Sequence, residues 1–246
     1  METATLDAVP APARRLPGAD LVGWWIVAGL VGALLTVPFG SLTTWLVTNA
    51  NSDNRGQWAT ILGGSATVVG LIAAGIAAAL QWQGMRPYLP QLKPLVWIVV
   101  TLLGTLGGQV IGSIWNILLQ QMWINWNVSS PQFWIGTLLG GVVVANVSGA
   151  LLGLVQGAVL RHGRAAANWT RVRAGVGALV ALGQLPILLI STILGVSTMG
   201  SSCLTAILGT LVGVGAAALL GLAMRGLIGH MLNPAIQPDP SPNPQA

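Results

Sequence analysis

Six long apolar runs divide this chain, and short polar segments separate them. Each run is about as long as the roughly 20 residues that a helix needs to cross a bilayer. No Lys, Asp or Glu interrupts the body of a run. The pattern predicts an all-α, polytopic membrane helix bundle with six transmembrane helices, near Leu21–Val47, Trp58–Gln83, Leu95–Gln120, Phe133–Leu160, Ala174–Val196 and Cys203–His230.

The two ends of the chain lack this pattern. Residues 1–20 are polar and show no helical periodicity, and residues 233–246 are rich in Pro. We predict a disordered tail at each end and one membrane domain over residues 21–232. Arg14 and Arg15 precede the first run as they would in a signal peptide. That run is much longer than the roughly 7–15 residues of a signal sequence, so we expect an uncleaved first span.

Composition places most of the chain in lipid. Of its 246 residues, 54% are hydrophobic and 6% are charged. A soluble domain carries about 25% charged residues, so this chain has too few to cover a water-facing surface. The net charge of +5 could suggest a nucleic-acid partner, but the charges lie between apolar runs. We therefore expect membrane lipids as partners and no nucleic acid.

The positions of the cations predict orientation. If there are six spans, all of the ten Lys and Arg residues except Arg55 fall on one side of the membrane. The positive-inside rule then places both termini in the cytoplasm of a cell whose plasma membrane holds the protein. The same cations could bind anionic lipid headgroups, and the candidates are Arg86, Lys93, Arg161, Arg164, Arg171 and Arg173.

Small residues recur at every fourth position in three of the runs. Because apolar burial does not drive helix association in lipid, close contact at small residues must do so. We predict that these faces form the tightly packed centre of the bundle, and a sliding Gly-lined path is the alternative. The positions are Gly104, Gly108 and Gly112; Gly141, Ala145, Gly149, Gly153 and Gly157; and Gly209, Gly213, Ala217 and Gly221.

The end of the second run has a counterpart at the end of the fourth. Shifting the chain by 75 residues aligns Gln81 with Gln156 and Arg86 with Arg161. A duplication that yields three helical hairpins would explain this alignment and would keep both Arg residues on one side. Such parallel repeats occur in transporters, but they also build stable bundles without transport.

The motif Gln81-Trp82-x-x-Met85-Arg86 follows a Gly- and Ala-rich span. It resembles a group of uncharacterised bacterial multi-span membrane proteins that repeat a Gly-rich Gln-Trp-x-x-Leu-Arg motif. The resemblance covers mainly the second to fifth spans, and the second copy has Gly157 where Trp is usual. The resemblance implies a bacterial inner-membrane protein and does not indicate an activity.

Amide side chains are the polar groups within or at the ends of the runs that could bind a ligand. In lipid they need partners, and interhelical hydrogen bonds contribute roughly 0.6–2 kcal/mol each. They could simply hold helices together, or line a cavity for a neutral polar solute or a lipid headgroup. The candidates are Gln109, Gln184, Asn116 and Asn146, together with the repeat pair Gln81 and Gln156.

The sequence offers little support for a catalytic function. The five Asp and Glu residues lie in the tails, at the start of the first run or in one loop, and neither His162 nor His230 has a carboxylate near it in the sequence. Cys203 is expected across the membrane from both His residues, so we predict no cofactor and no metal site. Our first hypothesis is a non-enzymatic membrane subunit or lipid-associated bundle, in contact with a membrane partner or a second copy. The alternative is an uncoupled permease or channel for a small neutral solute.

Overall fold

The computed structural model describes residues 17–49, 54–125, 131–160, 163–183 and 199–232. These ranges contain helices and short connections, and no strand occurs within them. The predicted all-α class is confirmed. The helices are α1 (Ala19–Asn49), α2 (Arg55–Met85), α3 (Pro94–Asn125), α4 (Pro131–Val159), α5 (Gly163–Gly183) and α7 (Met199–Leu232).

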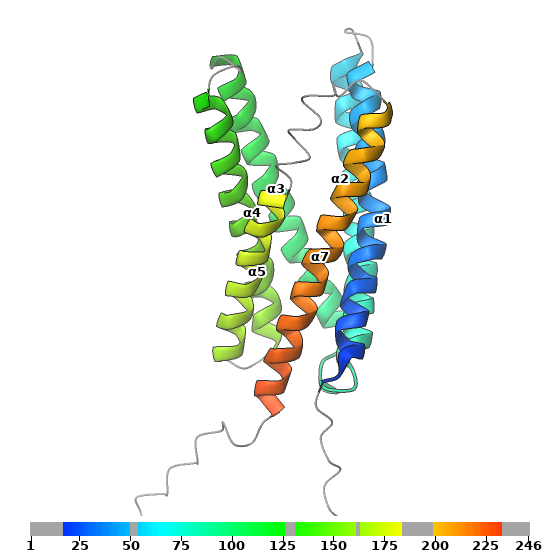
Figure 1. The fold of residues 1–246 in the computed structure, drawn as a ribbon, viewed down its shortest axis with the longest axis vertical. Coiled ribbons are helices and arrows are strands. Elements are labelled where there is room, and N and C mark those ends of the chain that lie inside the picture. The colour runs from blue at the N-terminus through cyan, green and yellow to red at the C-terminus, as the bar shows by residue number, and fades with distance from the viewer. Residues whose placement is uncertain (1–16, 50–53, 126–130, 161–162, 184–198, 233–246) are drawn as a thin grey trace, which may run out of the picture.

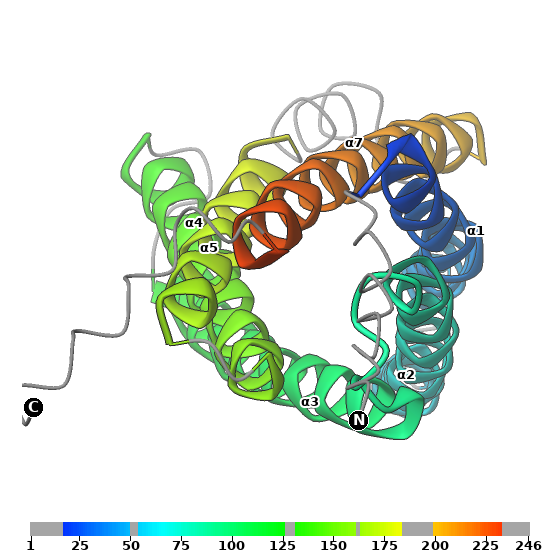
Figure 2. The ribbon, with the colours of Figure 1, turned by 90° about the horizontal axis from the view of Figure 1, so that it is seen from below.

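The helices alternate in direction and form a ring (Figures 1 and 2). Each helix packs against the next in the order α1, α2, α3, α4, α5 and α7, and α7 returns to α1. The start of α1, the loop between α2 and α3, and the end of α7 lie at the same end of the ring, the lower end in Figure 1. We call this the tail end.

Five of the helices contain stretches long and apolar enough to cross a membrane: Ala19–Gly40, Gly56–Met85, Pro94–Leu119, Leu138–Val159 and Ile207–Leu232. Large apolar side chains stay exposed on every described helix, including Leu103 at 57% and Leu154 at 61%. A water-facing bundle would cover such side chains, whereas lipid solvates them at no cost. The chain is thus a multi-span integral membrane protein.

The fifth predicted span needs correction at its start. The run was expected to begin at Ala174, with Arg164, Arg171 and Arg173 in the connection before it. Helix α5 already begins at Gly163, so all three Arg residues lie on the helix. Hydropathy missed this segment because cations interrupt it, although its Ala and Arg residues favour helix. The rest of the predicted span lies outside the described residues.

Helices α4 and α5 approach so closely that their contact leaves no room for side chains. A Cβ added at Gly149 would collide with the backbone carbonyl of Arg173, and one added at Gly153 would lie 2.8 Å from the Cα of Thr170. The predicted small face of the fourth span is therefore a helix contact. Gly141 is the exception, because a Cβ there would have nothing within 4 Å.

The other two small faces pack against neighbours in the same way. On α3, a Cβ at Gly104 would lie 2.9 Å from the Cα of Leu152, whereas Gly112 has open space. On α7, the small positions Gly209, Gly213, Ala217 and Gly221 meet Val37, Ala33, Gly29 and Trp25 of α1. The prediction of a common Gly-packed centre is wrong, because in a ring each helix packs against its two neighbours.

We predict that Gly149→Leu destabilises the bundle by about 1–3 kcal/mol, because the backbone of α5 must move to admit the side chain. Thermal unfolding and elution of the detergent-purified protein would measure the loss. Gly141→Leu is the matched control on the same helix and should behave as wild type. Equal behaviour of the two variants would contradict the α4–α5 contact.

Candidate functional site

Large buried side chains gather at the tail end of the ring. Each of the six helices contributes to this core, which also takes in Leu92 of the loop between α2 and α3. The largest fully buried side chains are Trp25, Trp97, Trp169, Leu21, Met85, Met224, Ile228 and Gln156. All of them lie in the parts of their helices nearest the tail end, so packing is densest there. Two polar arrangements lie within or beside this core.

The first arrangement is built around Gln156 of α4, whose side chain is fully buried. Its Nε2 donates to Thr101 Oγ1 of α3 at 2.8 Å. Its Oε1 accepts from Trp169 Nε1 of α5 at 3.1 Å. The Thr101 hydroxyl in turn donates to the carbonyl of Trp97 at 2.8 Å. Gln156 thus joins three helices and uses both atoms of its amide in hydrogen bonds.

Arg173 of α5 lies beside this network and stacks on two indoles. Its Cζ is 5.1 Å from the ring centroid of Trp169 and 5.5 Å from that of Trp25. The two rings pack edge to face, 5.6 Å apart and at 77°. Because α7 lies between α1 and α5 in the ring (Figure 2), this contact joins two helices that are not neighbours in it.

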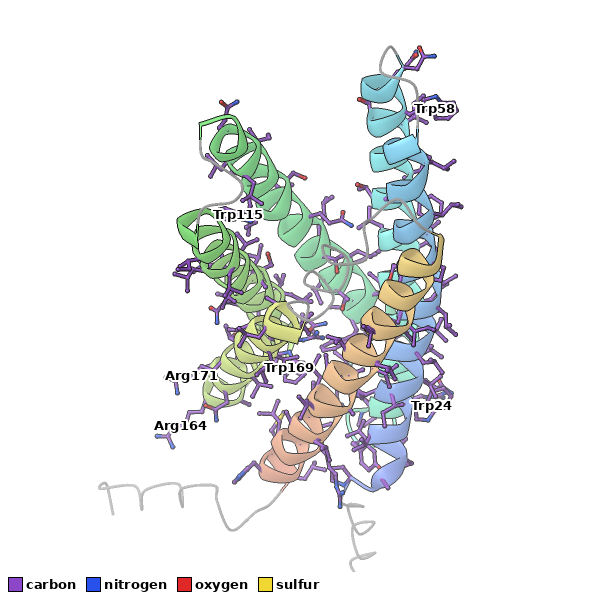
Figure 3. The ribbon with its side chains drawn as sticks, turned by 45° about the horizontal axis from the view of Figure 1, so that its top comes forward. Trp24, Trp58, Trp115, Arg164, Trp169 and Arg171 are labelled. Carbon is purple, nitrogen blue, oxygen red and sulfur yellow. The ribbon has the colours of Figure 1, made fainter. Side chains whose placement is uncertain are left out.

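This position corrects the expectation for Arg173 as a headgroup cation in a loop. The side chain is half-buried at the tail end, where it makes cation–π contacts with Trp169 of its own helix and with Trp25 of α1. Nothing local in the sequence shows that Trp25 and Trp169 meet, because they lie on helices that are remote in the chain. Arg164 and Arg171 on the same helix are exposed and point away from the bundle (Figure 3).

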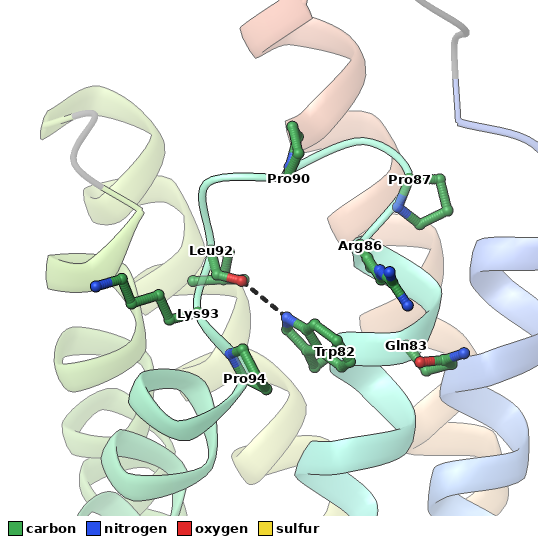
Figure 4. Close-up of a pocket in the computed structure, with 8 residues that line it drawn as sticks. All are labelled: Trp82, Gln83, Arg86, Pro87, Pro90, Leu92, Lys93 and Pro94. Carbon is green, nitrogen blue, oxygen red and sulfur yellow. Dashed lines mark hydrogen bonds between the residues drawn. The ribbon is translucent and has the colours of Figure 1, made fainter.

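The second arrangement is an open pocket of about 750 Å³ at the loop between α2 and α3 (Figure 4). Arg86 stacks over Trp82, one helical turn before it, with Cζ 5.7 Å from the ring centroid. The indole is fixed by a hydrogen bond of 2.8 Å from Trp82 Nε1 to the carbonyl of Leu92. The pocket is lined by Trp82, Gln83, Arg86, Pro87, Pro90, Leu92, Lys93 and Pro94.

The loop that forms the pocket is tied to the start of α1. Tyr88 Oη donates to Asp20 Oδ2 at 3.0 Å and accepts from the backbone N–H of Gly18 at 3.2 Å. Asp20 is the sole carboxylate within the described ranges. Since it is held by Tyr88, no described carboxylate neutralises Arg86 or Lys93, both of which are exposed.

Of the other amide candidates, Gln109 and Asn146 are described, and they contact different neighbouring helices. Gln109 of α3 lies against α2, with Nε2 2.9 Å from a Cβ built at Gly70. Asn146 of α4 donates instead to the carbonyl of Ala174 on α5, at 3.3 Å. The buried Oε1 atoms of Gln109 and Gln81 have no hydrogen-bond partner among the described residues. The side-chain amide oxygens of Gln81 and Gln109 therefore lack the hydrogen bond that the Gln156 oxygen has.

Three candidates cannot be placed. Gln184 and Arg161 lie outside the described residues, and Asn116 is described only as part of the α3 backbone. In the described part of the chain, no three His, Cys, Asp or Glu side chains are grouped so that they could hold a metal ion. The chemistry that the placed residues offer is hydrogen-bond donation and positive charge.

We predict that Gln156→Leu lowers stability by about 1–3 kcal/mol, because it leaves Trp169 Nε1 without its buried acceptor and Thr101 without its donor. Thermal unfolding in detergent would measure this change. The same substitution at the exposed Gln57 of α2 is the control and should have little effect. Equal stability of the two variants would show that the network does not hold the helices.

Comparison with known protein families, curated proteins and solved structures found no match to this chain. The resemblance to bacterial proteins with a repeated Gln-Trp motif therefore stays a prediction. A fold alone would not assign an activity in any case, so function has to be argued from the site. Two features at the tail end indicate a function: the cationic pocket between α2 and α3, and Arg173 stacked on two indoles.

Proposed function

We propose that this chain is a non-enzymatic membrane protein whose tail end binds anionic lipid headgroups. The observation that carries this proposal is the pocket between α2 and α3. Both Arg86 and Lys93 line it, and neither has a carboxylate partner among the described residues. Cations at a membrane surface attract anionic lipid by about 1 kcal/mol each.

The surroundings of the two cations suit a headgroup. Trp82 is the kind of residue that lies at headgroup level, and its stacking with Arg86 holds the guanidinium at the pocket. Pro87, Pro90 and Pro94 restrict the loop backbone, so the pocket needs little ordering when a ligand binds. Lipid could then reach an open, preformed site from the membrane surface.

We also propose that the tail end faces the cytoplasm. Arg86, Lys93, Arg164 and Arg225 all lie at or near this end, whereas Arg55 begins α2 at the opposite end. Under the positive-inside rule, the side with more Lys and Arg is cytoplasmic. This orientation would place the pocket against the inner leaflet, where anionic lipids give a negative surface potential.

The orientation predicts the reactivity of the single Cys. Cys203 lies in the first turns of α7, at the end of the bundle opposite the tail end. An impermeant maleimide added outside intact cells should label it, with denatured protein as the control for total thiol. Labelling that occurs only after the cytoplasmic side is opened would reverse the proposed topology.

Headgroup binding predicts the effect of removing the two pocket cations. The double variant Arg86→Ala, Lys93→Ala should bind phosphatidylglycerol about 30-fold more weakly, as expected for losing about 2 kcal/mol of attraction. Native mass spectrometry of the detergent-purified protein can measure this, with phosphatidylcholine as the reference lipid.

The matched control is Arg164→Ala, Arg171→Ala, which removes the same charge from exposed positions of α5 outside the pocket. This variant should keep most of its affinity for phosphatidylglycerol. If both double variants lose affinity equally, binding depends on overall charge and the pocket proposal is wrong.

A further inference from the structure

Arg173 is a half-buried cation without a described anion to accept its hydrogen bonds. Its Nε is buried and has no hydrogen-bond partner among the described residues, and the same is true of Trp25 Nε1 beside it. The one described carboxylate, Asp20, is occupied by Tyr88. Arg173 therefore packs against two indoles, and no described acceptor is hydrogen-bonded to its Nε.

The depth of Arg173 makes this arrangement unusual. It lies ten residues beyond Gly163, so about 15 Å along α5 from its first residue. Trp169 is one turn closer to the helix start. Cations within the helices of membrane proteins are rare, and many mark ligand or ion pathways.

The indoles satisfy only part of what a guanidinium requires. Their faces attract its positive charge, but they offer no lone pair to its five N–H donors. With Nε enclosed, donation to a ligand falls to the two Nη nitrogens at the end of the side chain. A pair of parallel N–H donors matches two oxygens of a phosphate group, and the stacking fixes the direction in which they point.

We propose that Arg173, held against Trp25 and Trp169, binds a phosphate group at the tail end of the bundle. The phosphate could belong to a lipid headgroup or to free inorganic phosphate. This site does not rest on the proposed function of the pocket, because it uses α1 and α5 where the pocket uses α2, α3 and their loop.

The test measures binding in the Arg86→Ala, Lys93→Ala background, so that the surface pocket does not contribute. The full chain is purified in detergent and freed of lipid. Inorganic phosphate is titrated calorimetrically at constant ionic strength, with chloride as the reference anion. In a second arm, phosphatidylglycerol is added in mixed micelles and bound lipid is counted by native mass spectrometry, with a neutral diacylglycerol as the reference.

We expect binding in at least one arm, reduced at least tenfold by Arg173→Gln and unchanged by Arg171→Gln. Arg171 is exposed on the same helix, so its variant matches the change in charge. Binding in the phosphate arm identifies a free anion as ligand, and binding in the lipid arm alone identifies a headgroup.

A second variant keeps the test decisive if Arg173→Gln does not fold. Arg173→Lys keeps the charge and loses the paired donors, so it should bind at least fivefold more weakly while still eluting as a folded protein. The proposal is overturned if the background protein binds neither ligand, or if Arg173→Lys binds as tightly as Arg173. Either result would leave Arg173 with a purely structural role in the indole core.

Discussion

Close approach of helix backbones is the constraint on which this structure depends. In lipid, apolar side chains gain nothing by leaving one apolar surface for another, so helices associate where their backbones come near enough for dense contact. Gly149 and Gly153 provide this contact between α4 and α5, and no Cβ fits at either position. The same contact brings Gln156 within hydrogen-bond distance of Trp169.

Polar interactions are concentrated where packing is densest. Gln156 bridges α3, α4 and α5, and Trp25 reaches across the ring to Trp169. A buried hydrogen bond in a medium of low dielectric constant is costly to break, because water cannot replace the lost partner. These contacts hold the helices together at the tail end. Nearer the opposite end, the described helices expose large apolar side chains such as Ile61 and Leu139.

The two cationic sites differ in how the chain forms them. The pocket is local, because Trp82, Arg86 and Lys93 lie within one helix end and the loop that follows it. The environment of Arg173 is assembled from α1 and α5, whose residues are remote in the sequence. The pocket is open and its cations are exposed, whereas Arg173 is half-buried against two indoles. They therefore differ in which ligands can reach them, although both offer positive charge to an anion.

The sequence by itself determined the helices, their approximate limits and their membrane setting, because bilayer thickness demands long apolar runs. It also identified most of the small faces, since a spacing of four residues places side chains on one side of a helix. The start of α5 was missed because the cations of its first turns lower hydropathy without opposing helix formation.

Tertiary structure alone decided which polar groups meet. Gln81 and Gln156 align as repeat partners, yet Gln156 has two partners on other helices and the Gln81 Oε1 has none among the described residues. The sequence predicts that Arg173 is a surface cation, whereas in the fold it stacks on Trp25. Hydrogen bonds and cation–π contacts depend on positions within a few ångströms. Those positions follow from how α1, α3, α4 and α5 pack, which no local pattern encodes.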